Sequence, residues 1–232
     1  MEIQEFAPRH LIARLVFEKK HAAVVDRRGE LADELHELLD VSSVAIGEAA
    51  TEATTDDGMS TYRIGIAQLV AVLNIDGLDE ERERMEGFFR RGMELLGAPS
   101  LSRVVAHTSD VAAVPSFDEL RDALLADFSP ATSQLRDAVG IPLSDCGWNF
   151  DFEDDRSAVE LVFGPMRERE LRRAFEAPES ADFPAASLFI DAEVTLRVRD
   201  SDNDPLDLWA SALDRNRRIT DNLSAWMRET LT

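Results

Sequence analysis

The sequence predicts an α+β protein in which an antiparallel sheet is covered by helices on one face. One observation is a strict two-residue alternation over Ser187–Val198, which is typical of a strand with one buried face. A second is an order of elements, proline then strand then helix, that begins at Pro8, Pro99 and Pro184. These prolines are 91 and 85 residues apart, and such a near-constant period indicates an internal duplication of βαββα-like units.

The first unit contains two expected helices and three expected strands. Leu11–Val25 is rich in Leu, Ile, Val and Phe, which favours a strand. Leucines recur at helical spacing across Gly29–Asp40. Val41–Ala50 and Tyr62–Ile75 predict two strands joined by a polar turn. Asp79–Leu96 then predicts a charged amphipathic helix.

The second unit opens with a strand over Leu101–Val114. Ser116 and Glu119 have the spacing of a capping box, which predicts a helix start. Trp148–Phe152 and Val159–Phe163 both alternate, with a polar turn between them, and this pattern predicts a hairpin. We expect the aromatic residues at 148, 150 and 152 to face the core, and Asp151 and Glu153 to lie on the opposite, solvated face.

Three elements complete the chain. Gly164-Pro165 predicts the start of a helix, because proline suits a first helical turn. Ser187–Val198 is the strand described above, and a long C-terminal helix follows it. Asp204 and Pro205 have the residue types of an N-cap and a first helical position. We therefore expect residues 1–97 to form a first α+β repeat, and residues 98–232 a second repeat plus the C-terminal strand and helix, the two packed as one compact unit.

Charge and composition exclude several classes of function. The net charge is −21, from 46 acidic and 25 basic residues, so repulsion argues against general binding of nucleic acid or anionic membranes. The one cysteine, Cys146, cannot form an internal disulfide. The acidic N-terminus lacks the apolar run of a secretory signal, and no stretch approaches a membrane span. These features predict an acidic, cytoplasmic protein.

The loop before the last helix carries the best candidate for a metal site. Asp200, Asp202 and Asp204 have the alternate spacing that begins a calcium loop. However, Pro205 stands where that loop needs glycine, and Ser211 where it needs glutamate. The other interpretation is a helix start with Asp204 as its cap. The acidic residues of the second hairpin, including Asp154, are a further carboxylate cluster, which a solvated strand face also explains.

Other sequence signals for catalysis or cofactor binding are weak. The four histidines are scattered, and neither a zinc-protease nor a nucleophile-elbow motif occurs. His107 lies in a polar interruption of an expected strand. Cys146 is a nucleophile only if a base lies beside it, and a buried structural thiol is the alternative. We therefore assign no catalytic residue and no cofactor.

The C-terminal helix carries the residues that we expect to bind a partner. Trp209 and Trp226 lie near its two ends, and tryptophan is enriched where interfaces concentrate their binding energy. Asn216 interrupts the apolar stripe, as a residue that sets the register of a helix pair would. Packing of this helix on the chain's own sheet is the alternative.

The two ends of the chain resemble a family of uncharacterised bacterial proteins of about this length. The resemblance rests on Ala7–Phe17, where a proline precedes an apolar strand, and on Leu188–Val198 followed by the helix over Leu213–Leu223. Asn216 and Leu223 stand near the places where the family tends to have histidine and phenylalanine. The resemblance implies no activity.

Together these features favour a non-enzymatic protein that interacts with a protein partner or with itself. One alternative is a carboxylate-metal-dependent enzyme that uses Asp200, Asp202 and Asp204 or the hairpin acids. Another is a small-ligand-binding protein with a pocket between the two repeats, since clefts between domain halves are common binding sites.

Overall fold

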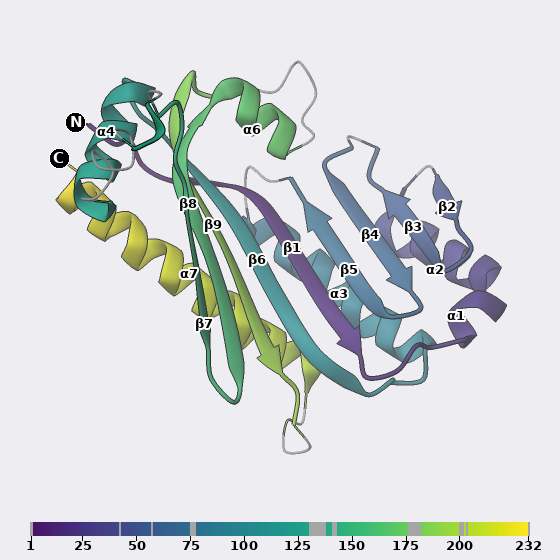
Figure 1. The fold of residues 1–232 in the computed structure, drawn as a ribbon. Coiled ribbons are helices and arrows are strands. Elements are labelled where there is room, and N and C mark those ends of the chain that lie inside the picture. The colour runs from purple at the N-terminus through teal and green to yellow at the C-terminus, as the bar shows by residue number, and fades with distance from the viewer. Residues whose placement is uncertain are drawn as a thin grey trace.

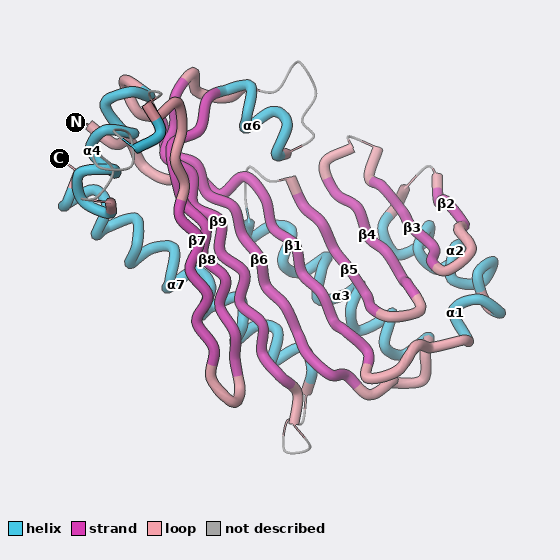
Figure 2. The backbone as a smooth tube through the Cα atoms, in the orientation of Figure 1, coloured by secondary structure: helices cyan, strands magenta, loops and turns pink. Residues whose placement is uncertain are grey.

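The computed structural model describes residues 2–231 except 42, 57, 75–77, 130–137, 141–142, 176–181, 200–201 and 203. It confirms the α+β class. The described strands form one antiparallel sheet in the order β2-β3-β4-β5-β1-β6-β9-β8-β7, and helices pack on it (Figures 1 and 2). None of the described helices is long and apolar enough to cross a membrane.

The strands are β1 (Ala7–Phe17), β2 (Val44–Ile46), β3 (Ala50–Thr54), β4 (Ser60–Gly65), β5 (Gln68–Leu73), β6 (Leu101–Ala113), β7 (Trp148–Glu153), β8 (Ser157–Arg167) and β9 (Ala186–Arg197). The helices are α1 (Ala23–Asp26), α2 (Arg28–Leu39), α3 (Leu78–Leu95), α4 (Phe117–Phe128), α6 (Glu168–Ala174) and α7 (Pro205–Thr230).

One face of the sheet carries most of the helices. Figure 2 shows α2, α3 and α7 behind the strands, and α7 contacts β1, β6 and β9 as it crosses them. The expected period of two is confirmed in β9, where Leu188, Ile190 and Val194 are fully buried beneath this layer. On the opposite face, α6 covers one end of the sheet, where Leu171 packs with Phe189. In β9 that face carries the polar half of the alternating pattern, Asp191, Glu193 and Thr195.

The structure does not confirm the internal duplication. The first unit has five strands where three were expected. Val41–Ala50 contains β2 and only the first residue of β3, the rest of β3 lies in the expected turn, and Tyr62–Ile75 contains β5 and most of β4. In each half the last strand pairs with the first, β5 with β1 and β9 with β6, and the remaining strands follow outward in reverse chain order. Both predicted repeats therefore contribute to one continuous sheet with corresponding strand orders. The first has an additional outer strand, β2, and the second has a helix, α6, between β8 and β9, so the predicted βαββα-like plan is not confirmed.

The expected helix start at Gly164-Pro165 is wrong. Strand β8 runs on to Arg167, and α6 begins only at Glu168. Pro165 pairs with Leu188 of β9, while β7 ends its pairing at Trp148, opposite Phe163. Beyond that point β8 is itself an edge of the sheet, and a proline in an edge strand loses no ladder hydrogen bond on its outer side.

Asn216 joins α7 to the sheet of the same chain. Its side chain is fully buried, and Nδ2 donates to the carbonyl of Ala106 at 3.1 Å and to that of Ala192 at 2.5 Å. Its Oδ1 accepts a hydrogen bond from the Thr108 hydroxyl at 2.6 Å. The expected role of Asn216 in a helix pair is therefore corrected: it fixes α7 against β6 and β9.

We expect Asn216→Ala to lower the free energy of unfolding by about 2 kcal/mol, because the Thr108 hydroxyl loses its buried acceptor. Asn222→Ala, one turn and a half along the same helix but exposed, is the matched control and should change stability by under about 0.5 kcal/mol. Urea denaturation of the two variants measures the difference. Equal costs would show that the polar contacts of Asn216 do not secure α7.

Candidate interaction surface

Strand β7 forms one edge of the sheet and exposes aromatic side chains. Its residues pair with β8 so that Phe150 lies opposite Leu161 and Phe152 opposite Val159, and both of those partners are buried. The expected face is therefore right, but the expected burial is wrong, since Phe150 is 39% exposed and Phe152 55%. An edge strand has a neighbour on one side only, so its apolar face is incompletely covered.

Trp226 of α7 extends this aromatic surface. It is 42% exposed and lies edge-on to Phe128 of α4, with ring centroids 5.2 Å apart. Phe128 in turn contacts Trp148 at 5.4 Å. The rings of Phe150 and Phe152 stack at 6.4 Å. We call Trp148, Phe150, Phe152 and Trp226 the aromatic edge.

The hairpin turn determines which backbone groups of β7 lack a partner strand. The Asp154 N–H donates to the Ser157 carbonyl at 2.9 Å. Residues that bond to a neighbouring strand alternate along an antiparallel ladder with residues whose groups point the other way. The even-numbered residues of β7 therefore bond to β8, and the odd-numbered residues point their N–H and C=O groups outward. Within the described chain, no strand pairs with that outer side.

The two tryptophans expected at an interface have different environments. Trp209 is fully buried in the core and packs on Phe89, with ring centroids 5.7 Å apart. It therefore stabilises this chain's own fold. Only Trp226 remains available to a partner. Sequence reasoning missed Phe150 and Phe152, because alternation reveals which face a residue lies on and not whether its strand is at an edge.

The acidic loop supports the helix-cap interpretation. Asp204 caps α7, where its Oδ1 accepts a hydrogen bond from the Leu206 N–H at 2.8 Å. Asp202 accepts one from the Arg156 guanidinium at 2.9 Å and one from the Arg199 N–H at 2.8 Å. Asp200 lies outside the described residues. Among the residues that are described, no group of three His, Cys, Asp or Glu side chains is arranged to hold a metal ion.

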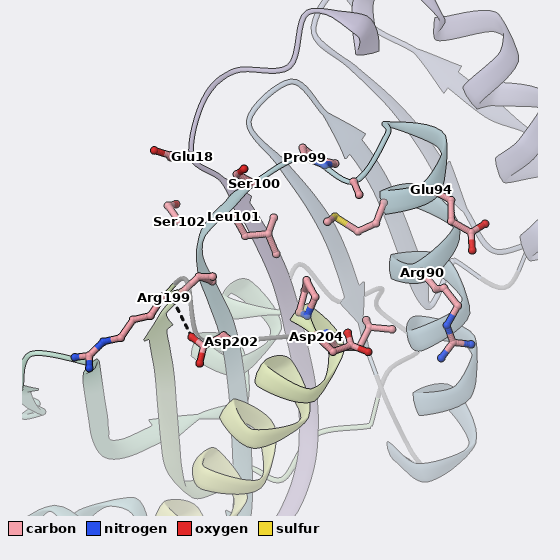
Figure 3. Close-up of a pocket in the computed structure, with 15 residues that line it drawn as sticks. Glu18, Arg90, Glu94, Pro99, Ser100, Leu101, Ser102, Arg199, Asp202 and Asp204 are labelled. Atoms are coloured by element: carbon pink, nitrogen blue, oxygen red, sulfur yellow. Dashed lines mark hydrogen bonds between the residues drawn. The ribbon is translucent and has the colours of Figure 1, made fainter.

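A cavity of about 670 Å³ lies where the two predicted repeats meet (Figure 3). Glu18, Arg90 and Glu94 line it from the first repeat, and Ser102, Asp202 and Asp204 line it from the second. The figure shows Asp202 turned toward the backbone of Arg199, and with the Arg156 contact both of its carboxylate oxygens already accept a hydrogen bond. The cavity combines charged groups of both signs with apolar walls.

The polar face of the sheet brings ionisable groups of three strands together. His107 Nε2 lies 2.8 Å from Asp191 Oδ1, and the Ser109 hydroxyl donates to the same oxygen at 2.5 Å. Arg14 donates to Glu193 at 3.4 Å beside them. Ser109 donates to Asp191, and His107 lies against the same oxygen, so the two side chains share one carboxylate and do not form a serine–histidine pair.

His10 borders this group and is neutral at physiological pH. Burial, followed by the nearby charge of His107, lowers the pKa of His10 from 6.5 to about 4. Its ring packs edge-on against Phe175 at a centroid distance of 6.0 Å. The sequence held one signal for this group, since His107 and Ser109 share a face of β6, but it did not identify β9 as the neighbouring strand.

Cys146 supports the structural interpretation. Burial and then the Asp145 carboxylate raise the pKa of its thiol to about 11. The thiol is therefore protonated at neutral pH, whereas the thiolate is the reactive form. The Asp154 carboxylate has a structural role in the hairpin turn, because it accepts hydrogen bonds from the N–H groups of Arg156 and Ser157.

No protein family model matches the chain, and a search of curated proteins finds no match. The resemblance of the two termini to an uncharacterised bacterial family therefore stays a prediction.

Proposed function

We propose that this chain is a non-enzymatic interaction protein that self-associates through the aromatic edge and the outward backbone groups of β7. The observation that carries the proposal is the exposure of Phe150 and Phe152 on an edge strand. Such an edge is a template for pairing with another strand. The other edge of the sheet, β2, is only three residues long and offers far less to pair with.

The side chains of β7 favour a second copy in one particular register. A twofold axis perpendicular to the sheet keeps the aromatic faces of both copies on one side, so residues of equal parity face each other. The register centred on Phe150 sets that residue opposite itself, Trp148 opposite Phe152, and Asn149 opposite Asp151. Aromatic cross-strand pairs are stabilising. A register centred on Asp151 would instead oppose two carboxylates, which is destabilising.

We expect the association to strengthen with added salt. Each copy carries a net charge of −21, and salt screens the repulsion between the copies. Sedimentation equilibrium of the full chain at low and high salt measures this. Phe152→Ala and Trp226→Ala should each raise the dissociation constant about tenfold or more, because truncating a central aromatic residue commonly costs over 1.4 kcal/mol.

Ile46→Ala is the matched control for these variants. Ile46 is 54% exposed, like Phe152, but lies on β2 at the opposite edge. Ile46→Ala should therefore leave the dissociation constant for self-association unchanged. A wild-type chain that stays monomeric at both salt concentrations would refute self-association, and an equal effect of Ile46→Ala would show that β7 is not the site.

Small-ligand binding is the second candidate, favoured by the 670 Å³ cavity between the predicted repeats. Clefts of this size with a few polar groups on apolar walls are typical of ligand sites. The polar groups that line it have both charges, which suits a zwitterionic or polar molecule.

A further inference from the structure

A second, smaller cavity lies between α7 and the helix-facing side of β6. Its volume is about 230 Å³. Thr108 and Asp110 of β6 line it from the strand, and Thr220, Asp221 and Ser224 line it from the helix. It is separate from the aromatic edge, from the cavity of Figure 3 and from the ionisable groups on the opposite face of the sheet.

One carboxylate oxygen in this cavity lacks a partner. Asp110 is 8% exposed, and its Oδ2 atom is buried without a hydrogen bond from any described residue. An ionised oxygen in that position has lost its water and gained no donor in exchange, which is costly. The cavity therefore presents an unsatisfied acceptor to whatever occupies it.

Two hydroxyl groups that line the cavity with Asp110, those of Thr108 and Thr220, donate their protons to other acceptors. The Thr108 hydroxyl lies within hydrogen-bonding reach of the Asp110 carboxyl, but its proton goes to Asn216 Oδ1 at 2.6 Å, because Asn216 Nδ2 donates to two backbone carbonyls and leaves Oδ1 as an acceptor. The Thr220 hydroxyl donates to the Arg217 carbonyl at 2.9 Å. A hydroxyl has a single proton and two acceptor lone pairs, so both oxygens can still accept but cannot donate. Together with Asp110 Oδ2, they provide three acceptors.

We propose that this cavity binds the protonated head of a small primary amine. An alkylammonium group has three N–H donors and no acceptor, which matches the three acceptor oxygens. The charges that line the cavity are the carboxylates of Asp110 and Asp221 and the guanidinium of Arg217, a net negative set that favours a cation. Asp191 adds negative potential from β9 on the opposite face of the sheet.

The test compares two organic cations on the full chain. Methylammonium chloride should raise the Tm saturably, by about 2–4 °C for each kcal/mol of binding free energy. Tetramethylammonium chloride at the same ionic strength has the same charge but no N–H donor. It should produce no rise beyond that of sodium chloride.

Asp110→Asn should abolish the methylammonium shift, and Asp207→Asn, an exposed position near the start of α7, should retain it. The shift should also be larger above pH 6 than below it, since Asp110 is ionised only above about that pH. Equal shifts with both ammonium salts, or an undiminished shift in Asp110→Asn, would overturn the proposal and leave ordinary water as the occupant. Self-association plays no part in either readout.

Discussion

Replacing Trp209 with alanine is expected to lower the free energy of unfolding by about 3–5 kcal/mol. The side chain is fully buried and packs on Phe89, which contacts Phe88 at a centroid distance of 5.3 Å. Phe88 continues this aromatic core to Tyr62 at 5.2 Å. Removing the indole leaves a cavity where α7 meets α3, and the neighbouring rings can refill it only in part.

Two variants control this result. The indole N–H of Trp209 is buried without a hydrogen-bond partner among the described residues, so Trp209→Phe loses no hydrogen bond and should cost much less than Trp209→Ala. Trp226→Ala removes a half-exposed ring and should cost less than the change to alanine at Trp209. Guanidinium denaturation ranks the three. If Trp226→Ala proved the more destabilising of the two alanine variants, the division of roles between the tryptophans would be contradicted.

Asp110 is expected to make the chain less stable as the pH rises through about 6. Burial, and then the charges of Asp221 and Asp191, raise the pKa of Asp110 from 3.8 to about 6. The folded state therefore holds this proton more tightly than the unfolded state does. The ionised carboxylate destabilises the fold above about pH 6, by about 3 kcal/mol for a pKa difference of this size, and the penalty disappears below pH 3.8.

Asp110→Asn isolates this contribution. It should stabilise the chain at pH 8 by about 2–3 kcal/mol and have little effect near pH 4. His10 acts in the opposite direction. Its lowered pKa means that its stabilising effect is complete above pH 6.5 and is lost as the pH falls toward 4. The difference between wild type and Asp110→Asn across pH cancels the His10 contribution, and a constant difference would contradict the account.

The local patterns of the sequence predicted most elements but not their arrangement. Alternation identified β9 and the β7–β8 hairpin, and the Asp204-Pro205 pair identified the start of α7, because each signal depends on neighbouring residues alone. The position of β9 between β6 and β8 depends on pairing between segments that are distant along the chain. Local periodicity contains no information about that pairing. The expected duplication rested on a local order of elements, and the structure does not confirm it.

The candidate surface shows the same limit at the level of single residues. Trp209 and Trp226 lie on one helix at similar distances from its ends, yet one is fully buried and the other is 42% exposed. The difference arises from the neighbours of each ring. Trp209 packs on Phe89 of α3 inside the core, whereas Trp226 packs on Phe128 of α4 near the edge of the sheet. Likewise, Phe150 became a surface residue only because β7 is the last strand.

Oxidative cross-linking of one engineered cysteine tests the β7–β7 contact most directly. Cys146→Ser removes the native thiol, and Phe150→Cys places a new one at the centre of the proposed register. Two such cysteines face each other in a non-hydrogen-bonded pair, where the strands approach closely. The account predicts a rapid disulfide-linked dimer for Phe150→Cys and none for Asn149→Cys, whose opposite residue would be Asp151. Equal cross-linking at both positions, or none at Phe150→Cys, would contradict it.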